Sequence, residues 1–196
     1  SEKDPMEYRV YYTRDSLVDE LRVLANEKFD AKDYSSAVSL YLILKKYEQP
    51  VSYQTIRQLS MCQYELGNYT ESIQAMKQLL HQFPNNIELI YSIAIINLDK
   101  LENPEEALLY FTFGKDRFSD KMSSIYGPNF KLIMDPAVAP DIYYDLFYGR
   151  ARTNMILQHY KEAASDCNWA IYLRPQQGEP YKIRANANVQ LNRFGS

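Results

Sequence analysis

Residues 24–44, LANEKFDAKDYSSAVSLYLIL, have the pattern of two amphipathic helices joined by a short turn. Lys32 and Asp33 interrupt the apolar pattern, and apolar residues recur at helical spacing on both sides of that break. Before the break these residues are Leu17, Leu21, Leu24, Ala25 and Phe29, and after it they are Ala37, Leu40, Tyr41 and Leu44. The segment therefore predicts a helical hairpin.

The same pattern returns further along the chain. Residues 59–80, LSMCQYELGNYTESIQAMKQLL, align with residues 24–44 without a gap, which places Tyr69 over Tyr34 at a distance of 35 residues. Residues 93–111, IAIINLDKLENPEEALLYF, show the pattern a third time. Self-similarity at a constant period of this length is the sequence signature of a repeat protein.

Two later segments continue the series. Residues 150–175, RARTNMILQHYKEAASDCNWAIYLRP, carry Tyr160 in the tyrosine position, and residues 180–194, PYKIRANANVQLNRF, begin a fifth unit. Because Pro104 takes the tyrosine position of the third unit, the successive spacings are 35, 35, 56 and 34 residues. The long spacing indicates an insertion between the third and fourth units.

Each unit also has the residues that helix packing requires. A small residue in the second helix permits close approach of the two helices, and a larger residue follows four places later. The small residues are Ala37, Ser72, Ala107 and Ala163, and the larger ones are Tyr41, Met76, Phe111 and Cys167. Pro84 and Pro175 follow second helices and stop them, because proline lacks the backbone donor. A hairpin this short cannot bury both of its faces, so neighbouring hairpins must stack.

These features resemble the tetratricopeptide repeat, whose signature runs from a large apolar residue through Leu-Gly or Leu-Ala and Gly-x-Tyr to a closing proline. The first unit matches at Leu21, Leu24, Ala25, Phe29, Asp33, Tyr34, Ala37, Tyr41 and Pro50, and the second at Leu59, Tyr64, Gly67, Asn68, Tyr69 and Pro84. The resemblance covers residues 16–194 and implies an all-α fold, a right-handed superhelical stack of antiparallel helix hairpins. Ser72, Pro104 and Gln158 depart from the pattern, and the third turn has one extra residue.

The units divide the chain into four segments. Residues 1–15 form an N-terminal extension without helical periodicity, which we expect to be extended or packed against the first repeat, with Ser16 as the helix N-cap. Residues 16–118 hold repeats one to three, residues 119–141 form the insertion, and residues 142–194 hold repeat four and the first helix of repeat five.

The insertion is expected to fold back onto the repeats. Three prolines oppose one long helix, and four apolar residues are too hydrophobic to remain in water. The prolines are Pro128, Pro136 and Pro140, and the apolar residues are Phe130, Leu132, Ile133 and Met134. We also expect the insertion to disturb the stacking of the third and fourth hairpins.

The composition of the chain indicates which kinds of partner it could bind and in which cellular compartment it is expected. The chain carries 22 Lys and Arg against 25 Asp and Glu, a net charge of -3 without a basic stripe, so nucleic acid is not expected as a partner. No apolar run approaches the roughly 20 residues that span a bilayer, and the first residues lack the layout of a secretory signal. Cys62 and Cys167 lie within helical patterns, as small buried residues do. These features predict an intracellular, cytoplasmic protein that does not insert into membranes.

No catalytic, metal or cofactor site is expected. The two histidines, His81 and His159, lie on different repeats without ligand neighbours at metal-binding spacing. A glycine-rich phosphate loop is absent from the sequence, and Glu105 and Glu106 begin a helix, where negative charge is favourable. We therefore expect a non-catalytic adaptor or scaffold domain, with a substrate-recruiting or regulatory module of a larger enzyme as an alternative.

The resemblance implies that the first helix of each repeat lines a concave groove. The residues expected there are Arg22, Asn26, Arg57, Gln58, Met61, Tyr91, Tyr148, Arg152, Lys182 and Asn186. Cationic side chains donate to carboxylates, tyrosines supply rigid area with a polar tip, and methionine adapts its shape. We expect the groove to bind a partner's peptide segment with acidic and apolar residues, and an ordinary solvated surface is the alternative. Self-association through the end of the array is also left open.

A further alternative is a co-chaperone that captures the acidic tail of a heat-shock chaperone. Tetratricopeptide-repeat proteins with that function resemble one another in a carboxylate clamp of Lys and Asn, then Asn, then Lys and Arg on three successive first helices. Here Arg22 and Asn26 fill the first pair, and Gln58 stands at the second place. Glu88 and Ser92 occupy the two cation positions, so the clamp is degenerate.

Chaperone tail peptides that end in Glu-Glu-Val-Asp should therefore bind this domain weakly or not at all. Glu88 stands where the terminal carboxylate needs a cation, and its own charge adds repulsion. Isothermal titration calorimetry measures the affinity. Low-micromolar binding that disappears in Arg22→Ala would contradict this expectation.

Overall fold

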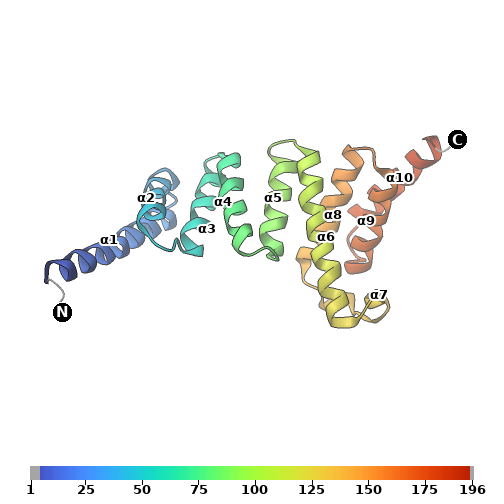
Figure 1. The fold of residues 1–196 in the computed structure, drawn as a ribbon. Coiled ribbons are helices and arrows are strands. Elements are labelled where there is room, and N and C mark those ends of the chain that lie inside the picture. Colours follow the sequence, from blue (N-terminus) through green and yellow to red (C-terminus); the bar gives the residue numbers. More distant parts are fainter. Residues whose placement is uncertain (1–4, 195–196) are drawn as a thin grey trace. The chain divides into compact units, whose positions relative to one another are not determined.

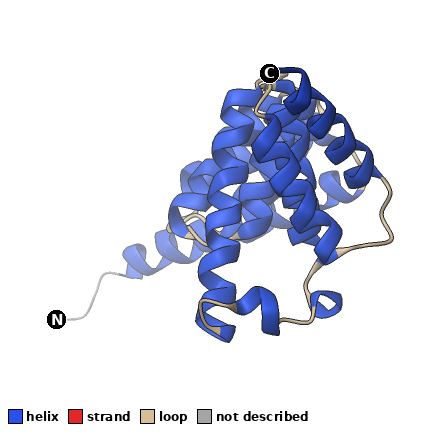
Figure 2. Ribbon diagram, turned by 90° about the vertical axis from the view of Figure 1, so that its right-hand side faces the viewer, coloured by secondary structure: helices blue, strands red, loops and turns tan. Residues whose placement is uncertain are grey.

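The computed structural model describes the backbone of residues 5–194 and the side chains of residues 15–193. Within this range every regular element is a helix, as Figure 2 shows. In chain order (Figure 1) they are α1 (Pro5–Asp30), α2 (Tyr34–Tyr47), α3 (Tyr53–Glu65), α4 (Tyr69–Gln82), α5 (Ile87–Asp99), α6 (Pro104–Tyr126), α7 (Phe130–Ile133), the 3-10 helix η1 (Pro136–Val138), α8 (Asp141–Ile156), α9 (Tyr160–Leu173) and α10 (Glu179–Phe194). The all-α prediction is confirmed.

The chain divides between Gln82 and Phe83 into two compact units. The N-terminal unit contains α1 to α4, in which consecutive helices pack on each other. The C-terminal unit contains α5 to α10, where α5 pairs with α6, α8 pairs with α9, and α10 packs on α9. Within each unit, antiparallel hairpins stack on one another (Figure 1). The sequence analysis placed repeats one to three in one segment and did not predict this division.

The turn inside each hairpin contains one residue in the left-handed conformation. These residues are Lys32, Gly67, Glu102 and Gln158, with φ angles of 60°, 78°, 51° and 61°. Each stands two positions before the tyrosine position of its repeat, so the turn follows the predicted spacing. The conformation satisfies the last carbonyls of the first helix, as in the bond from the Asp33 N–H to the Lys28 carbonyl at 2.9 Å. Glycine adopts it freely, whereas each other residue carries strain of about 1 kcal/mol.

Polar side chains begin the second helices. Asp33 caps α2 by accepting a hydrogen bond from the Ser36 N–H at 3.2 Å, and Asn103 caps α6 by accepting one from the Glu106 N–H at 3.2 Å. Pro104 is the first residue of α6, where a backbone N–H would have no partner within the helix. Proline therefore replaces the usual tyrosine without breaking the helix.

The small residue of each second helix is fully buried. Ala37, Ser72, Ala107 and Ala163 all have a relative exposure of 0%, which confirms the predicted close approach of the two helices. Ser72 is accommodated in place of alanine because its hydroxyl donates to the Ser60 carbonyl of α3 at 2.7 Å. Its burial therefore leaves no unpaired polar group.

Each unit has its own hydrophobic core. In the N-terminal unit the core joins α1, α2 and α3 through Val18, Ala25, Ala37, Tyr41, Leu44, Leu59 and Cys62. In the C-terminal unit aromatic rings surround the fully buried Phe118, whose ring centroid lies 4.8 Å from Tyr143, 5.3 Å from Phe147 and 5.5 Å from Trp169. Such pairs contribute about 0.5–1.5 kcal/mol each beyond their burial. The ring cluster fixes α6 to α8 and α9.

The predicted insertion begins as a continuation of α6. This helix runs through residue 119 to Tyr126 and extends beyond α5 (Figure 1). No proline interrupts residues 105–126, and Gly127, with a φ of 83°, ends the helix. The predicted start of the insertion at residue 119 therefore lies inside α6.

The rest of the insertion folds back only in part. Phe130 and Met134 are buried in the core of the C-terminal unit, whereas Leu132 and Ile133 are 88% and 64% exposed. Tyr172 of α9 holds the segment, because its hydroxyl donates to the Met134 carbonyl at 2.8 Å. The expected burial is confirmed for the first pair and wrong for the second, since a single helical turn has only one inward face.

Arg174, which directly follows α9, fixes the end of the insertion. Its Nη1 donates to the Pro136 carbonyl at 3.0 Å, and its Nη2 donates to the Ala139 carbonyl. Its Nε lies 2.7 Å from Asp141 Oδ1. These bonds hold the chain at the point where α8 begins.

The insertion leaves the stacking of its neighbouring hairpins intact. α6 packs directly on α8, and glycines let the two helices approach closely. A Cβ atom at Gly149 would lie 2.5 Å from the Phe111 ring, and one at Gly114 would collide with Leu146. The predicted disturbance of stacking is wrong because the additional residues lie beyond the contact between these helices (Figure 1).

The N-terminal segment also differs from the expectation. α1 begins at Pro5, so residues 5–15 are helical, and Ser16 lies inside the helix instead of capping it. Proline favours the first turn of a helix, and no glycine or proline interrupts residues 6–30. Once a helix has started, each further residue that joins it adds one backbone hydrogen bond. Residues 1–4 of the predicted extension lie outside the described residues.

Substitution of Gly149 tests the close contact between α6 and α8. Gly149→Ala should destabilise the fold by up to about 2 kcal/mol, because overpacking costs about 1–3 kcal/mol and the gain in helix propensity offsets only about 1 kcal/mol of that. Gly178→Ala is the matched control, since a Cβ atom there would meet nothing within 4 Å. Chemical denaturation measures both variants, and equal stabilities would contradict the proposed packing.

Candidate functional site

The predicted groove residues lie on both units. Arg22, Asn26, Arg57, Gln58 and Met61 belong to α1 and α3, and Tyr91, Tyr148, Arg152, Lys182 and Asn186 belong to α5, α8 and α10. Within the C-terminal unit the three first helices are neighbours, because α8 contacts both α5 and α10. We call the surface formed by Tyr91, Asp99, Tyr144, Asp145, Tyr148, Arg152, Glu179 and Lys182 the first-helix face.

An ion pair joins α5 and α8 on this face. Arg152 Nη2 lies 2.6 Å from Asp99 Oδ1, and the two side chains are 35% and 38% exposed. The hydrogen bond to Asp99 raises the pKa of Arg152 although burial acts in the opposite direction. The Arg152 guanidinium also lies 5.9 Å from the ring centroid of Tyr148. Two predicted residues and Asp99 thus form one connected group.

Three tyrosines supply the apolar part of the face. The rings of Tyr144 and Tyr148, one turn apart on α8, stack with centroids 5.9 Å apart and an interplanar angle of 7°. Tyr91 of α5 is partly buried. Burial raises the pKa of Tyr91, and the charge of Asp145 raises it further. The α5 tyrosine therefore lies in the electrostatic neighbourhood of an α8 carboxylate.

Lys182 of α10 lies at the other side of the face. Its Nζ is 2.7 Å from Glu179 Oε1, and both side chains are exposed. That hydrogen bond raises the pKa of Lys182, with a smaller contribution from Tyr148. Asn186 is exposed and accepts a hydrogen bond from Gln190 at 3.4 Å. Lys182 thus lies within the electrostatic reach of Tyr148, while Asn186 lies one turn further along α10.

The sequence analysis missed four residues of this face, and one of them, Glu179, precedes Lys182 by three positions on α10. Tyr144 and Asp145 precede Tyr148 by one helical turn and share its side of α8, so their spacing could have identified them. No local sequence spacing could have identified Asp99, because its partner Arg152 is 53 residues away in the chain.

In the N-terminal unit, Arg22 is held by two carboxylates. It lies 2.5 Å from Asp19 and 3.0 Å from Glu48. Glu48 is buried at the end of α2 and accepts a hydrogen bond from Thr55 Oγ1 of α3 at 2.8 Å. Burial raises the pKa of Glu48, but the hydrogen bonds from Thr55 and Arg22 help to outweigh it, and the pKa lies below its ordinary value. Arg22 thus ties α1 to the start of α3.

The other predicted residues of this unit differ in exposure. Asn26 accepts a hydrogen bond from the Tyr41 hydroxyl at 2.9 Å. Gln58 is only 9% exposed, and its Oε1 has no hydrogen-bond partner in the described part of the chain. Arg57 and Met61 are exposed on α3. These two residues are therefore the ones that a partner could contact without rearrangement.

Ion pairs cancel most of the positive charge that the sequence placed in the groove. Arg22, Arg152 and Lys182 each have a carboxylate oxygen within 3.0 Å. Of the four predicted cations, Arg57 is the one that forms no ion pair among residues 15–193. A concentration of positive potential does not follow from these contacts.

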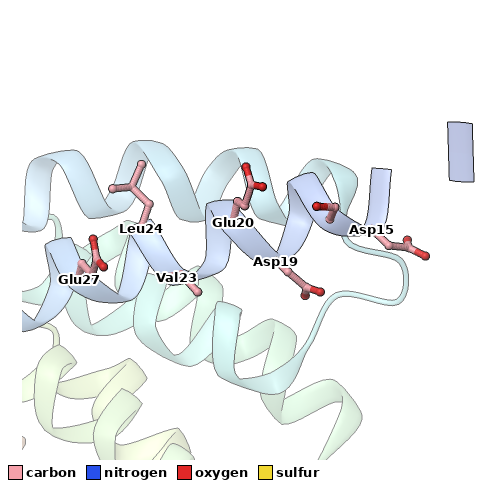
Figure 3. A pocket seen from close by; sticks show the side chains of 7 residues that line it. Asp15, Asp19, Glu20, Val23, Leu24 and Glu27 are labelled. Carbon is pink, nitrogen blue, oxygen red and sulfur yellow. The ribbon is translucent and has the colours of Figure 1, made fainter. Parts of the chain in front are cut away.

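A separate open hollow runs along α1, and Figure 3 shows the side chains that line it. Asp15, Asp19, Glu20 and Glu27 surround Val23 and Leu24 together with Ser16. None of the predicted groove residues lines this hollow. An acidic surface by itself indicates no particular ligand.

Other chemistry is limited in the part of the chain that the structure describes. No three His, Cys, Asp or Glu side chains gather there as a metal site requires. Cys62 and Cys167 are fully buried and unpaired, and burial raises the pKa of their thiols to about 11 and about 12. The prediction of small buried cysteines is confirmed. No described helix is both long and apolar enough to cross a membrane.

No protein-family model matches the sequence, and no curated protein matches it significantly. Solved structures do resemble the fold. MamA of AMB-1 superposes with a TM-score of 0.63 at 15% identity, over 92% of this chain and 86% of that chain. A mutant of MamA gives a TM-score of 0.63 at 14% identity, over 91% and 85% of the two chains. MamA contains tetratricopeptide repeats. This chain has the tetratricopeptide-repeat fold.

At this level of identity the similarity concerns the fold alone. The complex of the TPR2AB domain of yeast Sti1 with pHSP90 is also similar, at 17% identity over 92% of this chain and 86% of that chain, but its TM-score is 0.41. The fold assignment therefore rests on the MamA structures together with the repeated hairpin, turn and small-residue pattern.

The network around Glu48 gives a pH-dependent prediction. Because the pKa of Glu48 is lowered in the folded chain, its stabilising effect is present above the ordinary value of 4.5 and is lost as the pH falls through the folded value. Glu48→Gln should cost about 1.5–3 kcal/mol at pH 7, and the difference from the wild type should shrink in acid. Denaturation at several pH values measures it, with Glu20→Gln as an exposed control. A constant difference would refute this account.

Proposed function

We propose that this chain is a non-catalytic adaptor domain whose first-helix face binds a segment of a partner protein. The observation that supports the proposal best is the convergence of Tyr91, Tyr144 and Tyr148 on adjacent first helices, where each ring remains partly exposed. The tetratricopeptide-repeat fold supports the same proposal, because repeat proteins use the surface of their stacked hairpins for binding.

The chemistry of this face suits a peptide segment. Tyrosines present rigid apolar area with a hydroxyl at the tip, and they are enriched in protein interfaces for that reason. The ion pair between Arg152 and Asp99 fixes the guanidinium before a partner arrives, so less side-chain freedom is lost on binding. Arg57 and Met61 of the N-terminal unit form a second, separate set of candidate contacts.

The expected preference for acidic partners is the weaker part of the sequence-based hypothesis. A partner carboxylate would have to displace Asp99 from Arg152 or Glu179 from Lys182. Apolar groups of a partner need no such exchange, because they can pack directly on the tyrosine rings. The apolar contribution therefore carries the proposal.

The co-chaperone alternative has no comparable support. Arg22 and Asn26 would begin its carboxylate clamp, but Arg22 is bonded to Glu48 and Asn26 to Tyr41. A recruiting module of a larger enzyme would use the first-helix face in the same way, so that alternative concerns the rest of the protein and not this surface.

Tyr148→Ala should weaken binding by about 1–3 kcal/mol, as the loss of a central aromatic anchor does. Arg57→Ala tests the N-terminal set of contacts. A similar loss of binding free energy would show that the partner segment contacts this set, and an unchanged affinity would show that it does not. The ligands are short peptides selected from a random phage-displayed library on the intact chain, and calorimetry measures their affinity.

Glu162→Ala, on an exposed position of α9, is the control for this experiment. Thermal unfolding establishes that each variant is folded. Unchanged affinity in a folded Tyr148→Ala variant, with a loss in Glu162→Ala, would move the site off the first-helix face.

A further inference from the structure

Asp145 is the acidic residue of the first-helix face that has no partner in the described part of the chain. It lies on α8, beside Tyr144 and one turn before Tyr148, and is partly buried. Asp99 and Glu179, the other carboxylates of this face, each form an ion pair. Asp145 forms neither a hydrogen bond nor an ion pair among the described residues.

The surroundings of Asp145 make its negative charge unfavourable. Burial raises the pKa of Asp145, and the charge of Asp141 on the same helix raises it further. Arg174 acts in the opposite direction, but its guanidinium is bonded to Asp141 and to the insertion. Arg152 and Lys182 are paired with other carboxylates. The described chain therefore offers Asp145 no free cation.

Tyrosines on two helices lie within the electrostatic reach of this carboxylate. The charge of Asp145 raises the pKa of Tyr91 on α5 and contributes to the raised pKa of Tyr144 on α8, where burial and Tyr148 have larger effects. A carboxylate beside aromatic ring faces attracts a cation in two ways, through an ion pair and through the ring quadrupole. Arginine can use both, because its planar guanidinium donates to a carboxylate and stacks on a ring.

We propose that the bound partner segment places a basic side chain, arginine or lysine, on Asp145 beside Tyr91 and Tyr148. This inference rests on the proposed function and names the chemistry of its partner. The partner's cation would meet the carboxylate that this chain leaves unpaired. This inference reverses the preference for acidic partner residues that was expected from the sequence. An acidic segment would be repelled by the carboxylates of Asp99, Asp145 and Glu179 on this face.

Selection of random phage-displayed peptides on the intact chain tests this inference. Peptides selected on the wild type should be enriched in Arg and Lys relative to the unselected library. Their affinity, measured by calorimetry, should fall at least about tenfold on Asp145→Asn, as expected for the loss of a charge-assisted contact. Glu162→Gln removes an equal charge from an exposed position of α9 and should leave the affinity unchanged.

A double-mutant cycle separates a direct contact from a change in structure. Replacing the basic residue of the peptide by glutamine should cost about tenfold on the wild type and nothing further on Asp145→Asn. The melting temperature of Asp145→Asn should not fall, because the carboxylate has no internal partner to lose.

The outcomes distinguish this inference from the proposed function. Peptides that require Tyr148 but bind Asp145→Asn equally well, or that lack Arg and Lys, would overturn the inference and leave the proposed function intact. Peptides that are insensitive to both Tyr148→Ala and Asp145→Asn would overturn both.

Discussion

Each hairpin depends on one steric constraint, the close approach of two helices joined by a tight turn. A left-handed residue reverses the chain within a few positions, and this leaves no room for a large side chain where the second helix meets the first. The fully buried Ala37, Ser72, Ala107 and Ala163 satisfy that limit. Because the second helix fixes the rotation of the first about its axis, the residues that each first helix exposes follow from this contact.

The inserted residues between the third and fourth hairpins leave the first-helix face unchanged because they lie outside the contact between α6 and α8. Gly149 admits the Phe111 ring and keeps α6 packed on α8. The additional residues first extend α6 beyond its contact with α8. The chain then returns to the start of α8, where hydrogen bonds from Tyr172 and Arg174 fix it. Since the stacking persists, α8 remains beside α5, and Tyr91 stays within the electrostatic reach of Asp145. The added residues therefore alter the periphery of the C-terminal unit and leave the first-helix face in place.

The character of the face depends on which charges pair and not on how many are present. Arg152 and Lys182 suggest a basic surface when they are counted in the sequence, but each has a carboxylate partner in the structure. The group that remains unpaired is an acid, Asp145. A paired cation has little further attraction for a partner, whereas a partly buried, unpaired carboxylate gains from a cation that replaces its lost hydration. The same set of residues thus favours the opposite kind of partner.

By itself the sequence determined the hairpins, their spacing and their buried small residues, because helical periodicity and turn chemistry are local. It also placed Tyr148 and Arg152 on one side of one helix, since residues four apart lie one turn apart. It did not place the start of α1 at Pro5, because the residues before Ser16 carry no helical periodicity from which a helix could be predicted. The tertiary structure alone decided which charges meet: Arg152 and Asp99 are 53 residues apart. The tertiary structure likewise decided that Asp145 has no partner among the described residues. A local sequence pattern does not specify which side chains from distant parts of the chain come close to a given carboxylate.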